Sequence, residues 1–383
     1  MNKTKTKIVI ASVLKPVDDV RNYKKIASSL AANENYRIII LGIGGNSQPE
    51  SSQIIFKSWR KFNRLSFDRL RVQRAFWKTM KQEKPDLIIC TTFELLLTSV
   101  LFRSRHQVKI IYDIQEDYLK NLWHQKFYPT GLRHVVGLSI RAMEWALSPF
   151  ISGFTLAEKT YQNDIRFVRK KFLILENKSL PISPQKISEY FKVIFTGTIT
   201  SYSRAKESIE LYLQIKDQLP GSTLTVIGHV PVSNYQKLLE HSYHDTPNVA
   251  LKLSSNPIAH GEIVDEISSA NLGIIGYLPN PVNVNKIPTK LYEYTAAKLP
   301  YLVQNETTWS DIGAELGGVI PIDLTHPDGP YIKDRLANIA ISEYAKNGYL
   351  WREDEEKLSK FIHAIIRQLK HPNYLIFLNL YLY

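Results

Sequence analysis

Lys192-Val193-Ile194-Phe195-Thr196-Gly197 is the stretch that decides the fold, because a short apolar run ends there in a glycine turn. A helix-like segment follows over 203–218, and a second apolar run, 223–227, again ends at a glycine, Gly228. Short apolar runs that alternate with helical segments are typical of a parallel sheet covered by helices on both faces. The alternation continues, with helices expected over 260–270 and 289–297 and strands over 272–277 and 301–304.

The first half of the chain repeats this pattern. A helix is expected over 22–32, and strands over 7–14, 36–43, 86–91 and 108–114, with weaker candidates at 153–156 and 172–175. The Pro- and Ser-rich residues 179–184 separate the halves. The sequence therefore predicts two doubly wound α/β domains. Ligands bind at the carboxyl ends of the strands in such sheets, so we expect the active site in a cleft where the domains face each other.

Charge is distributed unevenly along the chain. The 383 residues carry a formal charge of +13, and their 44% of apolar residues excludes a disordered chain. Residues 1–180 hold 31 basic and 15 acidic side chains, a net charge of +16, whereas 181–383 hold 18 and 21, a net charge of −3. Between Lys57 and Lys84 there are ten basic residues and two acidic ones. This asymmetry predicts a polyanionic partner for the first half, either nucleic acid or an anionic membrane surface.

Targeting signals are missing from the sequence. No run reaches the roughly 18 to 20 apolar residues of a membrane-spanning helix. The basic start is followed by an apolar run, 8–13, that is too short for a signal peptide. The single cysteine, Cys90, excludes an intramolecular disulfide and a cysteine-based metal site. We therefore expect a cytoplasmic protein, peripheral on the inner face of the cell membrane if it binds lipid.

Several nucleotide-binding motifs can be tested against the sequence. No P-loop occurs, and Gly42-Ile43-Gly44-Gly45 fails as a dinucleotide fingerprint because position 47 is serine. No Asp-x-Asp pair is present to clamp a diphosphate through a metal. A bound diphosphate would therefore be held by helix N-termini and cationic side chains, and no metal or other cofactor is expected.

The segment 285–294, Asn-Lys-Ile-Pro-Thr-Lys-Leu-Tyr-Glu-Tyr, suits that purpose. Pro288 is pre-set for a helix start, and the N–H groups that follow it, beside Lys286 and Lys290, make a candidate anion site. Glu293, one turn further on, could accept hydrogen bonds from a ribose diol. The alternative is an ordinary helix start with solvated lysines.

This segment resembles the donor-binding helix of the retaining GT-B glycosyltransferases of family 4. That family has a P-[ST]-K-x-x-E-Y-like sequence before a small-residue turn and a proline, and here Ala296-Ala297-Lys298-Leu299-Pro300 follows. Over about residues 7 to 370, further stretches resemble the family's motifs in the family's order: Asp18-Asp19-Val20-Arg21, Lys84-Pro85-Asp86, Tyr112-Asp113-Ile114-Gln115-Glu116-Asp117, Phe195-Thr196-Gly197 and Val226-Ile227-Gly228.

The resemblance implies a GT-B fold of two Rossmann-like domains facing a central cleft. Residues 1–180 would bind the acceptor, 181–350 would bind the donor, and 351–383 would form a helix crossing back to the first domain plus an apolar tail. The donor would be a nucleotide-diphosphate sugar, and the acceptor a glycan or a lipid-linked molecule in cell-surface polysaccharide biosynthesis. Transfer would retain the anomeric configuration without a metal, and the protein would stabilise the leaving diphosphate.

The resemblance also assigns residues to roles. The implied donor-binding residues are Gly197, Arg204, Lys206, Lys286, Pro288, Thr289, Lys290 and Glu293. The implied catalytic residues are Asp113, Gln115 and Glu116, and the implied acceptor-binding residues are Arg21 and Glu94. Simpler roles stay open for some of these side chains: loop and helix caps for Asp113, Glu116 and Asp117, and a surface ion pair for Arg21.

Three positions depart from the family pattern. Asn285 stands where the family has the first glutamate of its E-x7-E motif, Gln115 replaces a histidine, and Thr198 replaces an arginine after the glycine turn. Glutamine can hydrogen-bond a sugar but cannot carry a proton. These departures leave the predicted fold intact and bear on the donor sugar and on the rate.

The basic segment between residues 57 and 84 interleaves cations with aromatic side chains and is expected to form a helix, and such a helix suits an anionic membrane. It would also suit nucleic acid, or the aromatics could belong to the core while the cations face water. Lipid-linked acceptors favour the membrane, so nucleic acid is the less expected partner. The candidate membrane residues are Trp59, Arg60, Lys61, Arg64, Arg71, Arg74 and Trp77.

Two other functions stay open, a nucleic-acid-binding protein using this face and a nucleotide-sugar epimerase on the same fold. The apolar tail 374–383 could be a docking strand, an interfacial anchor or a frayed end.

Overall fold

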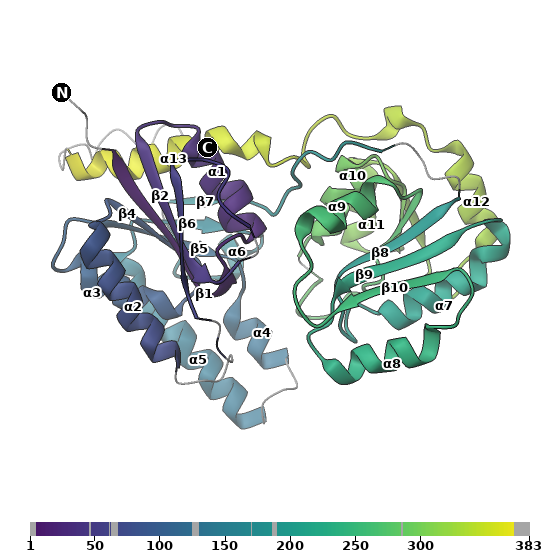
Figure 1. Cartoon of the computed structure of the whole chain (residues 1–383), viewed down its shortest axis with the longest axis horizontal. Coiled ribbons are helices and arrows are strands. Elements are labelled where there is room, and N and C mark those ends of the chain that lie inside the picture. Colours follow the sequence, from purple (N-terminus) through teal and green to yellow (C-terminus); the bar gives the residue numbers. More distant parts are fainter. Residues whose placement is uncertain are drawn as a thin grey trace. The chain divides into compact units, whose positions relative to one another are not determined.

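The computed structural model describes residues 5–45, 47–60, 62, 68–124, 130–169, 171–185, 190–284 and 286–370. The chain divides into two compact units (Figure 1). The first comprises Met1–Asn177 together with Asp354–Tyr383, and the second comprises Lys178–Glu353. Each unit is built on one parallel β-sheet that helices cover.

The sheet of the first unit has seven strands in the order β3-β2-β1-β4-β5-β6-β7. Their chain order reverses between β1 and β4, which makes this the switch point where ligands bind in doubly wound sheets. The strands are β1 (Thr6–Pro16), β2 (Tyr36–Ile43), β3 (Ile54–Trp59), β4 (Leu87–Cys90), β5 (Lys109–Ile114), β6 (Gly153–Leu156) and β7 (Phe172–Ile174).

Helices cover both faces of this first sheet. α2 (Asp68–Glu83), α3 (Glu94–Arg103) and α5 (Thr130–Leu147) lie on one face, where Phe76 and Phe102 share a core with Val9. The last helix, α13 (Arg352–Lys370), lies on the opposite face. A Cβ atom built on Gly153 would lie 2.6 Å from Cδ1 of Ile365 in α13, so β6 and α13 are in close contact. The remaining helices of the unit are η1 (Val20–Ala27, π-helical), α1 (Ser28–Ala31), α4 (Tyr118–His124), the short turn η2 (Ser148–Phe150) and α6 (Tyr161–Asp164).

The second unit has six strands in the order β10-β9-β8-β11-β12-β13, with its switch point between β8 and β11. The strands are β8 (Lys192–Thr198), β9 (Thr223–His229), β10 (Val249–Ser254), β11 (Leu272–Ile274), β12 (Tyr301–Gln304) and β13 (Val319–Ile322). The helices are α7 (Ala205–Ile215), α8 (Ser233–Tyr243), α9 (His260–Ser268), α10 (Thr289–Ala296), α11 (Thr308–Leu316) and α12 (Gly329–Asn338), with the short turns η3 (Lys216–Gln218) and η4 (Ile341–Glu343).

Side-chain alternation along β8 divides the core of the second unit into two layers. Val193 and Phe195 pack with α7, α8 and α12, whereas Ile194 between them packs with α9, α10 and α11. Strands buried on both faces need continuous apolar runs, which is the pattern that predicted them. The predicted fold class, two doubly wound α/β sheets, is confirmed.

The structure differs from the sequence-based prediction in several places. The segment 57–84 is not one helix, because β3 extends to Trp59 and α2 begins at Asp68. The helix expected over 22–32 is the π-helical η1 followed by α1. β3, β10 and β13 were not predicted, and all three are edge strands. β3 and β10 mix apolar residues with lysine and serine, so neither forms a continuous apolar run. The tail 374–383 lies outside the described residues.

In the described part of the chain, no helix has both the length and the apolar character that crossing a bilayer requires.

The buried carboxyl group of Glu144 in α5 makes the stability of the first unit depend on pH. Glu144 is 3% exposed, and its Oε1 accepts a hydrogen bond of 2.7 Å from the hydroxyl of Tyr112. Burial raises the pKa of Glu144 from an ordinary value of 4.5 to about 7, although Tyr112 and Arg141 act in the opposite direction. The folded state therefore binds more protons than the unfolded state between these values, so stability falls as pH rises from about 4.5 to about 7.

We expect Glu144→Gln to remove this pH dependence, because glutamine keeps a hydrogen-bond partner for Tyr112 without a charge. At pH 8 the variant should exceed the wild type by up to about 3 kcal/mol in free energy of unfolding, with little difference at pH 4.5. Urea unfolding at the two pH values measures this. The exposed Glu356→Gln is the control, and an equal effect of Glu144→Gln at both pH values would contradict the prediction.

Candidate functional site

The carboxyl edge of the second sheet brings together a glycine turn, a loop and a helix start at the switch point between β8 and β11. Gly197 near the end of β8 has a φ of +132°, in the region that favours glycine. A Cβ atom built on Gly197 would lie 3.7 Å from Cε of Lys290 in α10 and 4.0 Å from the hydroxyl of Tyr277. Segments about 80 to 90 residues apart in the sequence therefore meet at this glycine.

Helix α10 presents its N-terminus at this edge. Pro288 precedes the helix with φ −57° and ψ 129°, and a proline side chain has no atom that can cap a backbone N–H group. The first N–H groups of a helix carry a partial positive charge and commonly bind phosphate. The arrangement can hold a diphosphate without a metal.

Three ionisable side chains lie beside this helix start. Lys290 and Glu293 form an ion pair on one face of α10, with side-chain exposures of 10% and 12%. Nε2 of His260, the first residue of α9, lies 3.6 Å from Oε1 of Glu293. Burial alone would raise the pKa of Glu293, but Lys290 and His260 outweigh it and lower that pKa to about 2. Glu293 is therefore a carboxylate at neutral pH, able to accept hydrogen bonds from hydroxyl groups.

The other candidate donor-binding residues each have surroundings of their own. Arg204 has the left-handed φ of +58° at the start of α7. Lys206 is exposed and pairs with Glu210 of its own helix at 3.7 Å. The carbonyl of Lys286 accepts a 2.7 Å hydrogen bond from the indole of Trp309. Gly197, Lys290 and Glu293 are thus brought together, while Lys206 is directed along α7. Asn285 lies outside the described residues.

Two residues at this site escaped firm assignment from the sequence. His260, for which a helix-cap role stayed open, begins α9 after the N-cap Ala259 and faces Glu293. Tyr277 follows β11, and burial, with a smaller contribution from Glu293, raises the pKa of its hydroxyl. The sequence did contain a signal for Tyr277. In a doubly wound sheet β11 neighbours β8, which carries Gly197, so a residue just after β11 is expected near the Gly197 turn.

The first unit holds a second polar cluster, centred on Asp113 at the end of β5. Nε and Nη2 of Arg21 donate to the two carboxylate oxygens of Asp113 at 2.9 and 2.7 Å, and Thr155 donates to Oδ1 at 2.6 Å. Asp113 is fully buried. Burial alone would raise the pKa of Asp113, but Arg21 outweighs it and lowers that pKa. This geometry suits a positioning residue better than a group that contacts substrate.

Gln115 is held beside this ion pair by three partners. Its Nε2 donates to Asp113 at 2.6 Å and to Asn22 at 3.2 Å, and its Oε1 accepts from Nζ of Lys15. Lys15 also pairs with Asp19 at 3.4 Å. Lys15 and Asn22 were not identified from the sequence.

The remaining carboxylates of the first unit have separate surroundings. Burial raises the pKa of Glu94, which pairs with Arg69 at 3.3 Å. Glu116 is exposed and accepts a hydrogen bond of 3.1 Å from Asn121. Asp117 accepts from the backbone N–H of Lys120, as a helix cap does. Within the described ranges, His, Cys, Asp and Glu form no group of three or more that could ligate a metal ion.

The basic segment separates into partly buried aromatics that pack against the core and exposed cations. The indole of Trp59 donates to the carbonyl of Val13 at 3.1 Å, and Trp77 packs edge-on against Phe102 with a centroid distance of 5.5 Å. Arg60, Arg71 and Arg74 are exposed, and Arg71 pairs with Asp68 at 2.8 Å. The arrangement corresponds to core aromatics with cations facing water. Lys61 and Arg64 lie outside the described residues.

Two doubly wound sheets in one chain, each with polar residues at the carboxyl edge of its strands, define the GT-B class of fold. Solved structures with this architecture cover nearly the whole chain. Sucrose-phosphate synthase from Thermosynechococcus elongatus is 14% identical with a TM-score of 0.61, covering 96% of this chain and 98% of its own. Anabaena HepE in complex with UDP and glucose is 11% identical with a TM-score of 0.61, covering 96% and 99%. The catalytic domain of Arabidopsis thaliana starch synthase IV, bound to ADP and acarbose, is 10% identical with a TM-score of 0.64, covering 95% and 100%.

The same fold occurs in a protein assigned as a UDP-N-acetylglucosamine 2-epimerase from Listeria monocytogenes. It is 12% identical with a TM-score of 0.58, covering 95% of this chain and 96% of its own. No protein-family model and no curated protein matches the sequence. At these identities the likeness establishes the fold, and the activity has to be argued from the site.

Proposed function

We propose that this protein is a retaining, metal-independent glycosyltransferase of the family 4 type. It transfers a sugar from a nucleotide-diphosphate sugar to a glycan or lipid-linked acceptor in cell-surface polysaccharide biosynthesis, at the inner face of the cell membrane. The second unit binds the donor, and the first unit binds the acceptor through Glu94, Gln115 and Glu116. The predicted acceptor residue Arg21 is buried, and its guanidinium donates to Asp113, Leu175 and Asn177, so it supports this cluster from within. Asp113 positions Arg21 and Gln115.

The observation that carries the proposal is the cluster of Lys290, Glu293 and His260 at the start of α10, beside the Gly197 turn. The helix N-terminus and Lys290 supply positive charge for a diphosphate. The ionised Glu293, one turn along the helix, supplies an acceptor for the ribose hydroxyls. The helix N-terminus and Lys290 also stabilise the negative charge that develops on the leaving diphosphate. This stabilisation is the main catalytic task in such a transfer.

Thermal unfolding with candidate donors tests this site. UDP, GDP, ADP and their common sugar conjugates are added without metal to the wild type and to Glu293→Ala. A ligand at 100 times its Kd stabilises the native state by about 2.7 kcal/mol. At about 2 to 4 °C per kcal/mol for a unit of this size, one nucleotide should raise the Tm by about 5 to 10 °C.

Glu293→Ala should lose most of this increase, because the ribose contact is gone. Lys360→Ala, at an exposed α13 residue that pairs with Glu356 at 2.7 Å, is the matched control and should keep it. No increase in Tm with any nucleotide would refute the donor site. An increase that Glu293→Ala retains would place the nucleotide elsewhere.

A nucleotide-sugar epimerase is the second candidate, favoured by the epimerase-assigned structure that shares this fold. The two activities differ in their need for an acceptor. Incubation of the preferred nucleotide sugar alone leaves it unchanged with a transferase, apart from slow hydrolysis, whereas an epimerase converts it to its epimer. Proton NMR of the anomeric region distinguishes these outcomes.

A nucleic-acid-binding protein was the third function left open by the sequence. It predicts binding to any polynucleotide that weakens steeply with salt, and no stabilisation by nucleotide sugars. Fluorescence anisotropy with a labelled oligonucleotide at two salt concentrations tests it directly.

A further inference from the structure

Helix α5 exposes an apolar face to solvent. Between positions 131 and 146 the exposed residues are glycine, alanine, serine, leucine, valine and tryptophan, and no charged residue is exposed. Leu132, Val135, Leu138 and Trp145 have exposures of 52%, 62%, 53% and 67%. The charged residues Arg133, Arg141 and Glu144 lie on the inner side of the helix. A helix on the surface of a water-soluble domain normally has the reverse arrangement.

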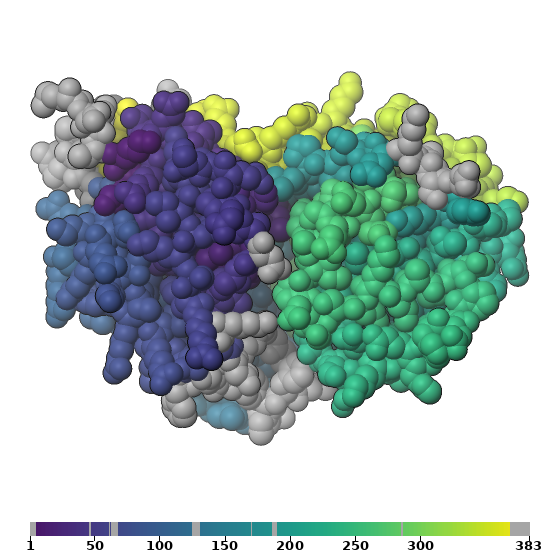
Figure 2. Space-filling view, viewed as in Figure 1, coloured from purple at the N-terminus to yellow at the C-terminus, as the bar shows by residue number. Residues whose placement is uncertain are grey.

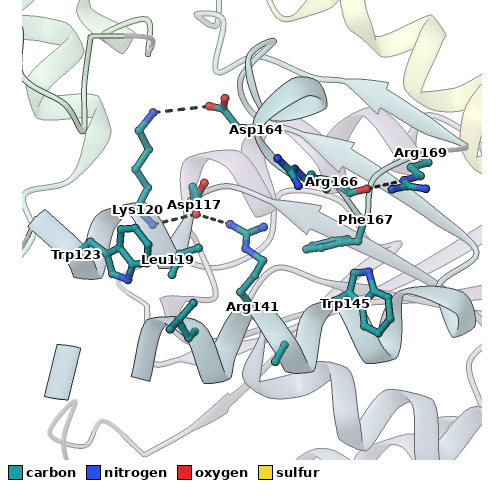
Figure 3. A pocket seen from close by; sticks show the side chains of 12 residues that line it. Asp117, Leu119, Lys120, Trp123, Arg141, Trp145, Asp164, Arg166, Phe167 and Arg169 are labelled. Carbon is teal, nitrogen blue, oxygen red and sulfur yellow. Dashed lines mark hydrogen bonds and ion pairs between the residues drawn. The ribbon is translucent and has the colours of Figure 1, made fainter. Parts of the chain in front are cut away.

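A pocket of about 770 Å³ opens beside this face, between α4, α5 and the residues after α6 (Figure 3). Trp123, Leu138 and Trp145 contribute its apolar wall. α4 can approach α5 closely because residue 137 is glycine, where a Cβ atom would lie 3.1 Å from Leu119 and 3.2 Å from Trp123. The apolar wall therefore continues from α5 onto α4.

The pocket lining also carries an excess of positive charge. It contains the four cations Lys120, Arg141, Arg166 and Arg169 but only two carboxylates, Asp117 and Asp164. Asp117 pairs with Arg141, and Asp164 lies 3.8 Å from Lys120. Arg166 and Arg169 are exposed, and Nε of Arg169 donates to the carbonyl of Arg166 at 3.0 Å. The two cations in excess of the carboxylates are thus solvent-exposed residues of a pocket with an apolar wall.

The neighbouring helices α3 and α2 extend the exposed apolar surface and the positive charge, respectively. α3 lies between α2 and α5 and contacts each of them. Leu97 and Leu101 of α3 have exposures of 48% and 52%. α2 exposes a row of cations, Arg71, Arg74, Lys78 and Lys81. Figure 2 shows the outer surface of α2 and α3 in blue, with side chains projecting from it.

We propose that the outer face of the α2-α3-α5 layer, with the α4–α5 pocket, docks onto the surface of a bilayer that contains anionic lipid. The apolar face of α5 enters the boundary between lipid headgroups and acyl chains with Leu132, Val135, Leu138 and Trp145. The cations of α2, together with Arg166 and Arg169 of the pocket, contact lipid phosphates. This inference extends the proposed function by naming the docking surface. Its readout is vesicle binding rather than donor binding, so either proposal can fail alone.

Charge and shape together select this occupant. An interfacial helix has an apolar face bordered by Lys and Arg, with tryptophan near the boundary, and this layer has each of these features. A protein partner would have to match an apolar ridge and a cationic row at the same time, which an anionic bilayer does throughout its surface. Residues 1–180 carry a net charge of +16, which attracts the chain to such a surface.

Co-sedimentation with vesicles tests the proposal. The full chain is mixed with vesicles of phosphatidylglycerol and phosphatidylcholine, or of phosphatidylcholine alone. Wild type should bind the anionic vesicles at least tenfold more strongly, and added salt should weaken this binding. Val135→Glu and Leu138→Glu should each lower it at least tenfold. Leu238→Glu, on a leucine of α8 with a similar exposure (48%), is the matched control and should bind like wild type.

A second measurement does not depend on glutamate variants folding. Brominated lipids quench tryptophan that enters a bilayer, so wild type should be quenched and Trp145→Tyr should lose a large part of that quenching. Binding unaffected by Val135→Glu and Leu138→Glu, with unchanged quenching in Trp145→Tyr, would overturn the proposal. A wild type that is dimeric without vesicles, and that Leu138→Glu makes monomeric, would also overturn it, because a second copy would then cover this face.

Discussion

Replacing Lys290 with methionine is expected to lower kcat for sugar transfer by about 10² to 10³-fold, with a much smaller change in KM. The ammonium group of Lys290 lies at the N-terminus of α10 beside Gly197, where the leaving diphosphate of a bound donor would gain charge. Removing one preorganised group that stabilises transition-state charge typically has an effect of this size. Steady-state transfer with the nucleotide identified by thermal unfolding measures it.

The same variant should change the acid limb of the pH–rate profile. Lys290 is the largest favourable influence on the low pKa of Glu293, so its loss raises that pKa toward the ordinary range. Activity that remains should then decline at a higher pH than in the wild type. Lys360→Met removes an exposed lysine from α13 and should leave kcat unchanged. A Lys290→Met enzyme with wild-type kcat would remove Lys290 from the mechanism.

Gly228→Ala should destabilise the second unit by at least about 3 kcal/mol, and the variant is expected to express poorly. Gly228 on β9 pairs with Gly197 on β8, and a Cβ atom at residue 228 would lie 2.0 Å from the carbonyl oxygen of Gly197. That contact is with backbone, so relief requires the two strands to separate. The Gly197 turn would move with them, so folded protein should also lose stabilisation by nucleotide.

Gly261→Ala provides a control of opposite sign. Gly261 lies in α9 and is exposed, and a Cβ atom added there would have open space within 4 Å. Alanine in an open helical position stabilises by about 0.5 to 1 kcal/mol. Urea unfolding of both variants compares them directly. Equal unfolding midpoints for Gly228→Ala and the wild type would show that the strands adjust to the methyl group without cost.

The central strands were predicted well because their burial on both faces produces a recognisable sequence pattern. β1, β2, β5 and β8 are covered on both faces, so each appears as a continuous apolar run between polar segments. β3 and β10 could not be predicted in this way, because both mix apolar residues with lysine and serine. β3 also begins the basic segment, whose cations made a single amphipathic helix the simpler interpretation.

The candidate donor site was only partly predictable. A resemblance of ten consecutive residues located the helix that carries Lys290 and Glu293. The approach of His260 to Glu293, 33 positions away, depends on how α9 and α10 pack on one face of the sheet. Asp113 illustrates the converse, because its position after a strand suggested chemistry while its complete burial against Arg21 indicates a positioning role.

Helix α5 shows why an apolar face that points to solvent could not be predicted from the sequence. The pattern over 130–147 has an apolar side and a charged side, as any amphipathic helix has. Periodicity gives the angle between those sides but does not say which one faces the sheet. The hydrogen bond between Glu144 and Tyr112 of β5 fixes the charged side inward.

The return of the chain's last helix to the first unit has a consequence for biosynthesis. Leu358, Phe361, Ile362 and Ile365 of α13 are buried, and they cover a sheet whose last strand ends about 180 residues earlier. During translation the first unit therefore emerges with one face of its sheet uncovered. The second unit can complete its core before α13 has been synthesised to cover that face. Ribosome-bound chains that stop near residue 350 should accordingly engage chaperones through the first unit, and release should follow only when the final helix leaves the exit tunnel.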